Sequence, residues 1–222
     1  MHKISIVIPA YNEEKYLKKT VLSFVKSFPK EEIIIVPNGC TDKTPEIAVN
    51  LSKKFSNVKN FIIKEKVGKG AAVVYGLRKS SGYIIGFVDA DGSYKPKHVK
   101  KLIDSFEKKT LVCGSKRFDK DEYIIRKITS FGWNFLARIL FGIKMKDTQA
   151  GAKIMDRKVF DSIKKFTSKG FAFDVELIFK AKKNGFKIKE IPLKISHKNK
   201  KLFIFLLIPN MFIELMKLRL SI

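Results

Sequence analysis

Short apolar runs alternate with helical patterns through the first half of the chain. The apolar runs are rich in β-branched residues and are bounded by polar or turn-forming residues, which is typical of buried strands. Alternation of such strands with helices indicates βαβ units. The sequence therefore predicts an α/β fold, with a Rossmann-type, mostly parallel sheet and flanking helices. The predicted strands lie at residues 3–10, 31–38, 59–65, 83–89 and 110–115.

Helices are expected between these strands. Asn12 is a candidate helix cap, and the apolar residues after it recur at helical spacing until Pro29 ends the run. The next helix opens at Thr44 with Pro45 as its first residue, and a later one follows Pro96. If the strand order is the common 3-2-1-4, the carboxyl ends of the first and fourth strands border a crevice in which ligands bind.

The pattern changes in the second half of the chain. Residues 122–143 form a long helical pattern that is rich in aromatic residues. Such a helix either belongs to the core or turns its apolar face to lipid. Trp133 favours the membrane interface, because an indole can bury its ring there and keep its N–H hydrated. Residues 170–186 then predict a helix that stops at Gly185, and residues 187–196 predict a final strand.

The carboxyl-terminal segment is a candidate for membrane contact. Residues 202–222 are strongly apolar, but a proline and several polar residues interrupt them, whereas a membrane span needs roughly 18 to 20 uninterrupted apolar residues. We expect a helix that lies in the membrane interface. The alternatives are a helix packed on the protein's own core or on a dimer partner, and a membrane anchor. The expected division is a catalytic domain at residues 1–198, including an interface helix at about 122–143, and a membrane-associating amphipathic helix at 199–222.

Charge and cysteine content narrow the function classes. The 222 residues carry a formal charge of +25 with an isoelectric point near 10.0, so the surface attracts nucleic acid, anionic lipid headgroups or phosphorylated small molecules. The lysines are spread along the chain, which argues against a nucleic-acid partner. Cys40 and Cys113 have no metal-ligand spacing, which fits a reducing, cytosolic setting. The first residues are interpreted as a strand and not as a signal peptide.

Two carboxylates, Asp89 and Asp91, end the fourth predicted strand. Carboxylates held this close repel each other, so a compensating cation is expected. Mg²⁺ carrying a diphosphate is the obvious candidate, because this ion prefers one or two carboxylates together with phosphate oxygens. Tyr94 and Lys100 stand where an EF-hand loop needs Gly and Glu, which excludes that loop. A solvated turn is the alternative interpretation.

A glycine-rich stretch precedes this strand. Gly68, Gly70 and Gly76 match neither the P-loop order nor a dinucleotide-binding fingerprint. The last two glycines could permit close packing of a helix. Alternatively, Lys69 and the amino end of that helix could add positive potential for a phosphate group. The sequence leaves both interpretations open.

A series of motifs in one order covers roughly residues 3–195. The motifs are ISIVIPAYNEE, NGCTDKT, GKGAAV, VDAD, GSKR, DTQAGAKIM and GFAFDVELIFKAKKNGFKIKEIPL. In this order they resemble the inverting glycosyltransferases of family 2. Within that family the chain is similar to the dolichyl-phosphate sugar synthases, particularly the dolichyl-phosphate glucosyltransferase branch. The resemblance implies a GT-A-like (nucleotide-diphospho-sugar transferase) fold. It also implies metal-dependent transfer of a hexose from a nucleotide sugar, of the UDP-glucose or GDP-mannose type, to dolichyl or polyprenyl phosphate.

The resemblance also implies roles on the donor side. Asp89 and Asp91 would hold a divalent metal, Mg²⁺ or Mn²⁺, on the nucleotide diphosphate, and no protein nucleophile is expected. The remaining donor-side residues would line the nucleotide pocket, contact the base or attract the phosphates: Pro9, Ala10, Tyr11, Glu13, Asn38, Gly68 and Lys69.

On the acceptor side, the resemblance implies that Arg117 and Arg126 grip phosphate groups. Arginine suits this role because its guanidinium forks onto phosphate oxygens. Asp147, Thr148 and Gln149 would form the acceptor-side wall of the sugar pocket. Two acids on the next helix, Asp174 and Glu176, would hydrogen-bond sugar hydroxyls or order Arg117, with structural ion pairing as the alternative.

Departures from the family pattern bear on the substrates. Asn38 follows Pro37 where family members often have an acidic pair, which leaves the choice of uracil or guanine open. Ala150 and Ala152 replace a usual Cys and Phe, which leaves the sugar open, whereas Ser93 matches the glucosyl branch. We expect a peripheral enzyme at the cytoplasmic face of a membrane. A soluble saccharide or protein acceptor is the alternative, and a non-catalytic nucleic-acid-binding protein is a remote one.

Overall fold

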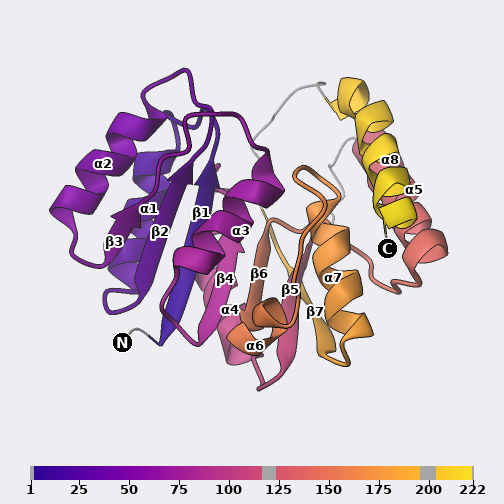
Figure 1. Cartoon of the computed structure of the whole chain (residues 1–222). Coiled ribbons are helices and arrows are strands. Elements are labelled where there is room, and N and C mark those ends of the chain that lie inside the picture. Colours follow the sequence, from indigo (N-terminus) through magenta and orange to yellow (C-terminus); the bar gives the residue numbers. More distant parts are fainter. Residues whose placement is uncertain (1–2, 117–123, 196–203, 222) are drawn as a thin grey trace.

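The protein folds as a mostly parallel sheet with helices on both faces, which confirms the predicted fold class (Figure 1). The computed structural model describes residues 3–116, 124–195 and 204–221, and the side chains of residues 3–115, 132–195 and 212–221. Its strands are β1 (Ile4–Ala10), β2 (Glu32–Pro37), β3 (Val58–Asn60), β4 (Ile84–Val88), β5 (Thr110–Lys116), β6 (Ala152–Asp156) and β7 (Lys187–Leu193). Its helices are α1 (Leu17–Ser27), α2 (Thr44–Lys54), α3 (Lys69–Lys79), α4 (Pro96–Asp104), α5 (Ile124–Phe141), α6 (Arg157–Asp161), α7 (Phe173–Lys183) and α8 (Ile204–Ser221).

The strand order of the described residues is β3-β2-β1-β4-β6-β5-β7. β1 pairs in parallel with β2 on one side and with β4 on the other, and β2 pairs in parallel with β3. The first half of the sheet therefore has the predicted 3-2-1-4 order. This order brings the carboxyl ends of β1 and β4 together at one edge, where a ligand crevice was expected.

The second half of the sheet differs from the sequence prediction. β6 was not predicted, and it runs antiparallel between β4 and β5. Its apolar pattern is short and is interrupted by Lys153, so periodicity alone does not reveal it. The strand predicted at 59–65 is wrong in extent, because β3 ends at Asn60 and the chain then leaves the sheet. Beyond that point a single bridge joins Ile63 to Asn38.

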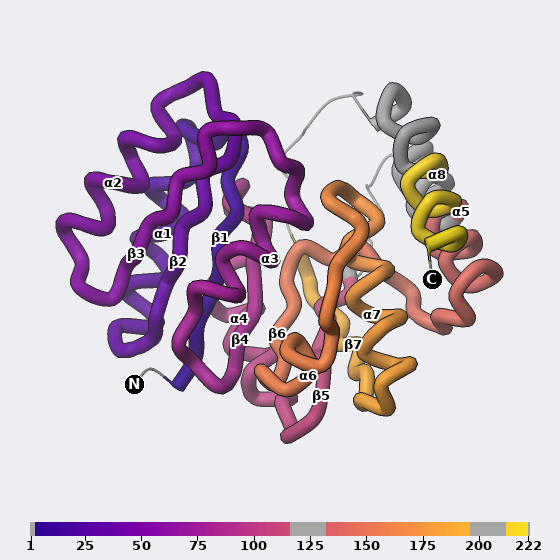
Figure 2. The backbone as a smooth tube through the Cα atoms, in the orientation of Figure 1, coloured from indigo at the N-terminus to yellow at the C-terminus, as the bar shows by residue number. Residues whose placement is uncertain are grey.

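Each face of the sheet carries its own hydrophobic core. Side chains alternate between the two faces along a strand, so Val7 and Ile34 pack with α3 and α7 whereas Ile6 and Ile33 pack with α1 and α2. The tube trace shows these layers and places α5 and α8 at one end of the molecule (Figure 2). The strands β1, β2 and β4 are thereby buried on both sides, as their continuous apolar runs require.

The start of α1 corrects one prediction. The helix begins at Leu17, and its capping position is Tyr16 and not Asn12. Asn12 has a φ of 52°, and its side chain exchanges hydrogen bonds with the Thr41 hydroxyl and the Thr41 N–H. Asn12 therefore joins the loop after β1 to the loop after β2. The predicted start of α2 at Thr44 is confirmed, but the capping position is Lys43 and Pro45 is the second residue of the helix.

The helices α5 and α8 lie side by side (Figure 1). Leu215 and Leu218 of α8 are fully buried in the core. On α5, the Trp133 ring is buried and its N–H donates to the Thr148 hydroxyl at 3.1 Å. The interpretation of Trp133 as an interface residue is therefore wrong, because its N–H is satisfied inside the protein. Among the described residues, no helix is both long enough and apolar enough to span a bilayer. Peripheral membrane contact stays a prediction.

Candidate functional site

The Asp89 and Asp91 pair lies directly beyond the carboxyl end of β4, as predicted. The Asp89 N–H donates to the Gly151 carbonyl at 2.9 Å, which extends the β4–β6 pairing to this residue. The Thr20 hydroxyl donates to the Ala90 carbonyl at 2.9 Å, and the Asp91 carboxylate accepts from the Ser93 N–H at 3.0 Å. Hydrogen bonds thus hold the backbone at Asp89 and Ala90 and the carboxylate of Asp91.

The Asp89 carboxylate lies against Lys69 and Gly151. Its Oδ1 is 2.7 Å from the Lys69 Nζ. A Cβ on Gly151 would lie 1.8 Å from the Asp89 Oδ2, so no other residue fits at this position without moving the carboxylate. The Gly151 N–H donates to the Tyr94 hydroxyl oxygen at 2.8 Å. The residue directly before β6, a strand that was not predicted, therefore lies against this carboxylate.

Lys69 is the first residue of α3. Burial alone would lower its pKa, but the negative charges of Asp89, Asp174 and Asp91 outweigh that effect and raise the pKa above its usual value. The Lys69 side chain therefore stays protonated and positively charged beside the carboxylate pair. Burial raises the pKa of Tyr94 well above its usual value, and nearby carboxylates add to the effect, so this hydroxyl stays protonated.

A second ion pair, of Lys153 and Asp174, lies near the pair of Lys69 and Asp89. The Lys153 Nζ is 2.5 Å from the Asp174 Oδ1 and donates to the Ala150 carbonyl at 2.8 Å. Lys153 is fully buried and Asp174 is almost so. The Nζ atoms of Lys69 and Lys153 lie 5.8 and 5.5 Å from the centre of the Phe87 ring. The two lysines therefore share one aromatic side chain, and each pairs with a different acid.

Lys153 was not among the predicted site residues. The signal that could have revealed it is a lysine at an inward position of an apolar run, because a buried charge needs a partner. That partner is Asp174. Its contact with Lys153 agrees with structural ion pairing, which was the alternative to a role of Asp174 in binding the sugar. Glu176 shows the same pattern: it is fully buried and accepts from the Thr167 and Ser168 N–H groups and from Lys180.

The loop at residues 146–151 is braced from two other elements. Glu190 on β7 accepts from the Lys146 and Asp147 N–H groups. Asn134 on α5 accepts from the Thr148 N–H and hydroxyl at 3.0 and 2.8 Å. Asp147, Thr148 and Gln149 on this loop were predicted as site residues, whereas the residues that hold the loop were not. Asp147 is buried and accepts from the Gln149 N–H at 3.1 Å.

The predicted nucleotide-side residues gather at the ends of β1 and β2. Asn38 is buried, and its side chain donates to the Ala10 carbonyl at 3.2 Å. That amide therefore points inward in this structure, and its contact with a base stays a prediction. Tyr11 is 42% exposed, with the Lys66 Nζ 4.2 Å from the centre of its ring. The Glu13 N–H donates to the Thr44 hydroxyl, and Pro9 pairs with Val36 in the sheet.

The glycine-rich stretch is now explained in part. Gly68 precedes α3 with a φ of 90°, and a Cβ there would lie 2.5 Å from the Lys169 carbonyl oxygen. A Cβ on Gly76 would lie 2.5 Å from Val7. A Cβ on Gly70 would lie 2.4 Å from the Phe173 Cβ. The packing interpretation is therefore confirmed for Gly70 and Gly76, whereas Gly68 and Lys69 lie at the site itself.

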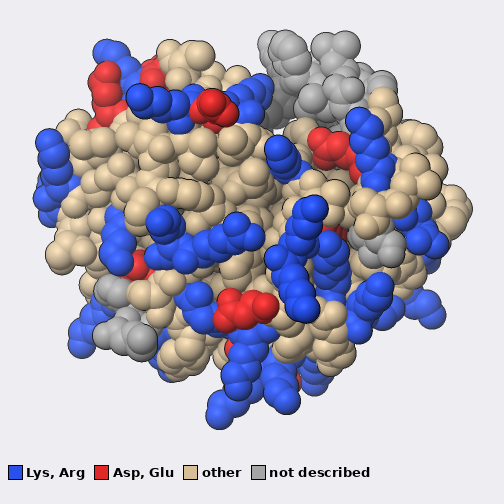
Figure 3. Space-filling view, viewed as in Figure 1, with Lys and Arg blue, Asp and Glu red and all other residues tan. Residues whose placement is uncertain are grey.

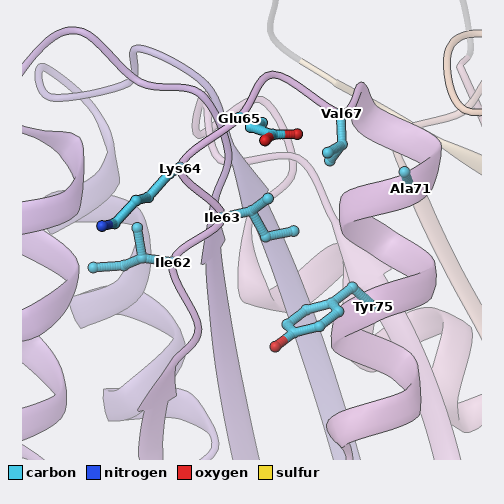
Figure 4. Close-up of a pocket in the computed structure, with 7 residues that line it drawn as sticks. All are labelled: Ile62, Ile63, Lys64, Glu65, Val67, Ala71 and Tyr75. Carbon is cyan, nitrogen blue, oxygen red and sulfur yellow. The ribbon is translucent and has the colours of Figure 1, made fainter.

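A cavity of about 480 Å³ lies outside this cluster, between α3 and the loop that follows β3. Figure 4 shows the ring of Tyr75 on α3 facing that loop. None of the predicted site residues lines the cavity, which is formed by Ile62, Ile63, Lys64, Glu65, Val67, Ala71 and Tyr75.

The two predicted arginines are not placed. Arg117 lies outside the described residues, and Arg126 lies in the part of α5 whose side chains are not described. Among the visible side chains, lysines and arginines are spread over the face seen in Figure 3, and acids are fewer. This spread agrees with the even distribution of lysines along the sequence.

Comparison with known proteins identifies related sequences. Residues 5–164 match the family described as Glycosyl transferase family 2. An uncharacterized protein of Methanocaldococcus jannaschii is 33% identical over 205 residues, which cover 86% of this chain and 81% of the relative. A dolichyl-phosphate beta-glucosyltransferase of Trichomonas vaginalis is 31% identical over 214 residues, and the match covers 86% of this chain. The chain spans 65% of the length of that enzyme and 32% of the glycosyltransferase AglD of Haloferax volcanii.

Solved structures share the fold. Glucosyl-3-phosphoglycerate synthase from Mycobacterium tuberculosis, in complex with Mn²⁺, uridine diphosphate and phosphoglyceric acid, superimposes with a TM-score of 0.75 at 21% identity. The superposition covers 98% of this chain and 78% of the synthase. A crystal structure of the same enzyme with Mg²⁺ and uridine diphosphate gives a TM-score of 0.73 at 20% identity. The predicted GT-A-like fold is therefore confirmed.

Proposed function

The chain belongs to glycosyl transferase family 2, and from this premise we propose that it transfers a hexose from a nucleotide sugar to polyprenyl phosphate. The proposal rests on the position of the Asp89 carboxylate. It lies beyond the end of β4, and its Oδ1 is 2.7 Å from the Lys69 Nζ. This arrangement suits a donor that brings both a metal ion and a diphosphate. The site also lies where nucleotides bind in folds of this type.

Asp89 and Asp91 fit a divalent metal. Both are oxygen ligands, and the described residues contain no cluster of three or more metal-binding side chains that would complete a protein cage. Such a pair suits Mg²⁺ or Mn²⁺, whose other ligands would come from phosphate oxygens and water. The metal, when bound, would neutralise charge on the departing nucleotide diphosphate. Relatives of this fold were crystallised with Mn²⁺ or Mg²⁺ and uridine diphosphate.

The protein's own residues would position the reactants. Lys69 would release part of its contact with Asp89 and place its charge near the diphosphate. The loop at residues 146–151, braced by Glu190 and Asn134, would form the wall of the sugar site. A phosphate monoester is already ionised at neutral pH, so its attack on the anomeric carbon needs little help from a general base. Positioning and charge stabilisation would then supply most of the acceleration, with inversion at that carbon.

Two observations favour a lipid phosphate as acceptor. The Trichomonas vaginalis relatives are dolichyl-phosphate beta-glucosyltransferases, at 31% and 29% identity. In addition, α5 and α8 expose large apolar side chains, a surface that would suit the membrane interface at the cytoplasmic face. The exposed residues are Phe135, Ile139, Phe212, Ile213, Met216 and Leu220.

The experiment that tests this function is a product analysis. Purified protein is incubated with Mn²⁺ and each of two donors, UDP-glucose and GDP-mannose. Polyprenyl phosphate, phosphoglyceric acid and a soluble saccharide serve as separate acceptors. Mass spectrometry should detect a hexosyl polyprenyl phosphate as the main product. Transfer to phosphoglyceric acid or to the saccharide alone would overturn the proposed acceptor.

The variant that accompanies this assay is Asp91→Ala, with Asp104→Ala as its control. Asp91 would bind the metal, so we expect a loss of turnover of about 100-fold or more, on the scale of losing one preorganised charge-stabilising group. Asp104 is an exposed acid that pairs with Lys100 on α4, away from the site. A folded Asp91→Ala variant with near-normal turnover would contradict the metal assignment.

A further inference from the structure

The helix α8 makes a polar contact with the start of α7. The Glu214 Oε2 accepts a hydrogen bond from the Ala172 N–H at 3.0 Å. Ala172 is the residue that precedes the first turn of α7, where N–H groups lack partners within the helix and a negative charge is favoured. Leu215 and Leu218 anchor α8 in the core beside this contact.

Gly170 makes room for this carboxylate. A Cβ on Gly170 would lie 2.2 Å from the Glu214 Oε1, and the three atoms nearest to that Cβ all belong to Glu214. Gly170 is not among the glycines with positive φ. Its lack of a side chain is therefore explained by the space that Glu214 occupies and not by an unusual backbone conformation.

The opposite side of the same segment touches the start of α3. The Lys169 carbonyl accepts from the Ala71 N–H at 3.2 Å. A Cβ on Gly68 would lie 2.5 Å from that carbonyl oxygen, and a Cβ on Gly70 would lie 2.4 Å from the Phe173 Cβ. Lys69 stands between these two glycines and reaches Asp89. In Figure 1, α7 lies between α3 and α8, as these contacts require.

We propose that Glu214 is a positioning residue of the donor site. Its carboxylate holds residues 170–172, which keeps the Lys169 carbonyl against the amino end of α3 and places the Lys69 ammonium beside Asp89. The carboxyl-terminal helix is then part of the machinery that binds the nucleotide. The effect on donor binding rests on the proposed function, whereas the effect on the start of α3 does not.

A double-mutant cycle tests this proposal. Glu214→Ala removes the carboxylate, and Gly170→Ala pushes it off the Ala172 N–H. Each variant should weaken binding of UDP or GDP in the presence of Mn²⁺ by about tenfold, on the scale of losing a hydrogen bond to a charged group. The double variant should bind no more weakly than Glu214→Ala, because the new methyl group then has space. Binding is measured by titration calorimetry.

Controls separate positioning from general stability. Glu214→Gln keeps an oxygen acceptor and should recover most of the affinity, and Lys217→Ala, an exposed position on the same helix, should leave it unchanged. In turnover assays Glu214→Ala should raise the KM for the donor and leave the KM for the acceptor unchanged. Additive losses in the double variant, or a folded Glu214→Ala protein with wild-type affinity, would overturn the proposal.

Amide hydrogen exchange gives an independent readout. Glu214→Ala should accelerate exchange at Ala71, whose N–H donates to the Lys169 carbonyl. If the wild-type protein binds neither UDP nor GDP, the proposed function fails, and exchange at Ala71 still decides whether Glu214 positions α3. Unchanged exchange at Ala71 would refute that role.

Discussion

At the residue scale, Asp89 depends on the absence of a side chain at position 151. Gly151 lies directly beneath the carboxylate, and its N–H is held by the Tyr94 hydroxyl. The Asp89 N–H in turn donates to the Gly151 carbonyl. Contacts with Gly151, the residue before β6, thus hold Asp89 at the end of β4, and the carboxylate has a defined position in the site.

A single added methyl group should therefore disturb the site. We expect Gly151→Ala to displace the Asp89 carboxylate and lower transferase activity by about tenfold or more, because a misplacement of this size weakens an oriented contact. The control is Gly132→Ala on α5, where a Cβ would meet nothing within 4 Å. That variant should stabilise the helix slightly, by up to about 1 kcal/mol. Equal activity in both variants would contradict the assigned geometry.

The buried pair of Lys153 and Asp174 offers a second test. Lys153→Met would leave Asp174 buried without this partner, and breaking such a pair costs about 3 to 5 kcal/mol of unfolding free energy. The double variant Lys153→Met with Asp174→Leu removes both charges and should regain most of that loss. Denaturant unfolding measures both variants. If Lys153→Met were as stable as the wild-type protein, the pair of Lys153 and Asp174 would not be buried in solution as it is in this structure.

At the element scale, α5 and α8 combine a buried and an exposed side. Leu215 and Leu218 face the core, while Ile139 on α5 and Ile213 on α8 are 62% and 47% exposed. The packed side agrees with the alternative of a terminal helix on the protein's own core. The exposed side is what a helix in the membrane interface would present. These two roles are compatible, because they use different faces of the same helix.

The exposed side gives a prediction about vesicles. We expect the double variant Ile139→Asp with Ile213→Asp to bind vesicles of anionic phospholipid less tightly, because charges replace apolar side chains at the contact. Flotation with the vesicles measures binding. Tyr83→Asp, a change at another exposed aromatic residue, serves as the matched control and should bind as the wild-type protein does. Loss of binding in the control alone would place the contact elsewhere.

At the scale of the whole molecule, positive charge dominates the surface. The formal charge of +25 is spread over the molecule, as the visible face shows (Figure 3). Such a field attracts anionic membranes and anionic substrates alike, and raises the rate at which they meet the protein. The apolar faces of α5 and α8 would then determine how the protein lies on a membrane.

The salt dependence of vesicle binding should separate the contribution of the positive charge from that of the apolar faces. Raising the ionic strength from about 0.1 M to 1 M shortens the screening length from about 10 Å to 3 Å. We expect binding to anionic vesicles to fall strongly over this range and the weaker binding to neutral vesicles to change little. Flotation across a salt series provides the measurement. Salt-independent binding to anionic vesicles would mean that apolar contact alone holds the protein there.

Much of the fold could be predicted because its signals are local. Strand patterns located β1, β2, β4, β5 and β7, and the 3-2-1-4 order followed from a common topology. β6 and the true end of β3 could not be predicted in this way. A short strand is stabilised by its neighbours in the sheet, and Lys153 breaks its apolar pattern, so only pairing with β4 and β5 reveals it.

The sequence by itself determined the alternating strands and helices, the excess positive charge, and the two carboxylates at the end of β4. Each of these is a property of residues close together in the chain. Only the tertiary structure decided that Gly151 lies under Asp89, that Lys153 neutralises Asp174, and that Glu214 reaches the start of α7. These contacts join residues that are distant in the sequence. Their energies depend on burial and on distances between atoms, and both are defined only when the chain is folded.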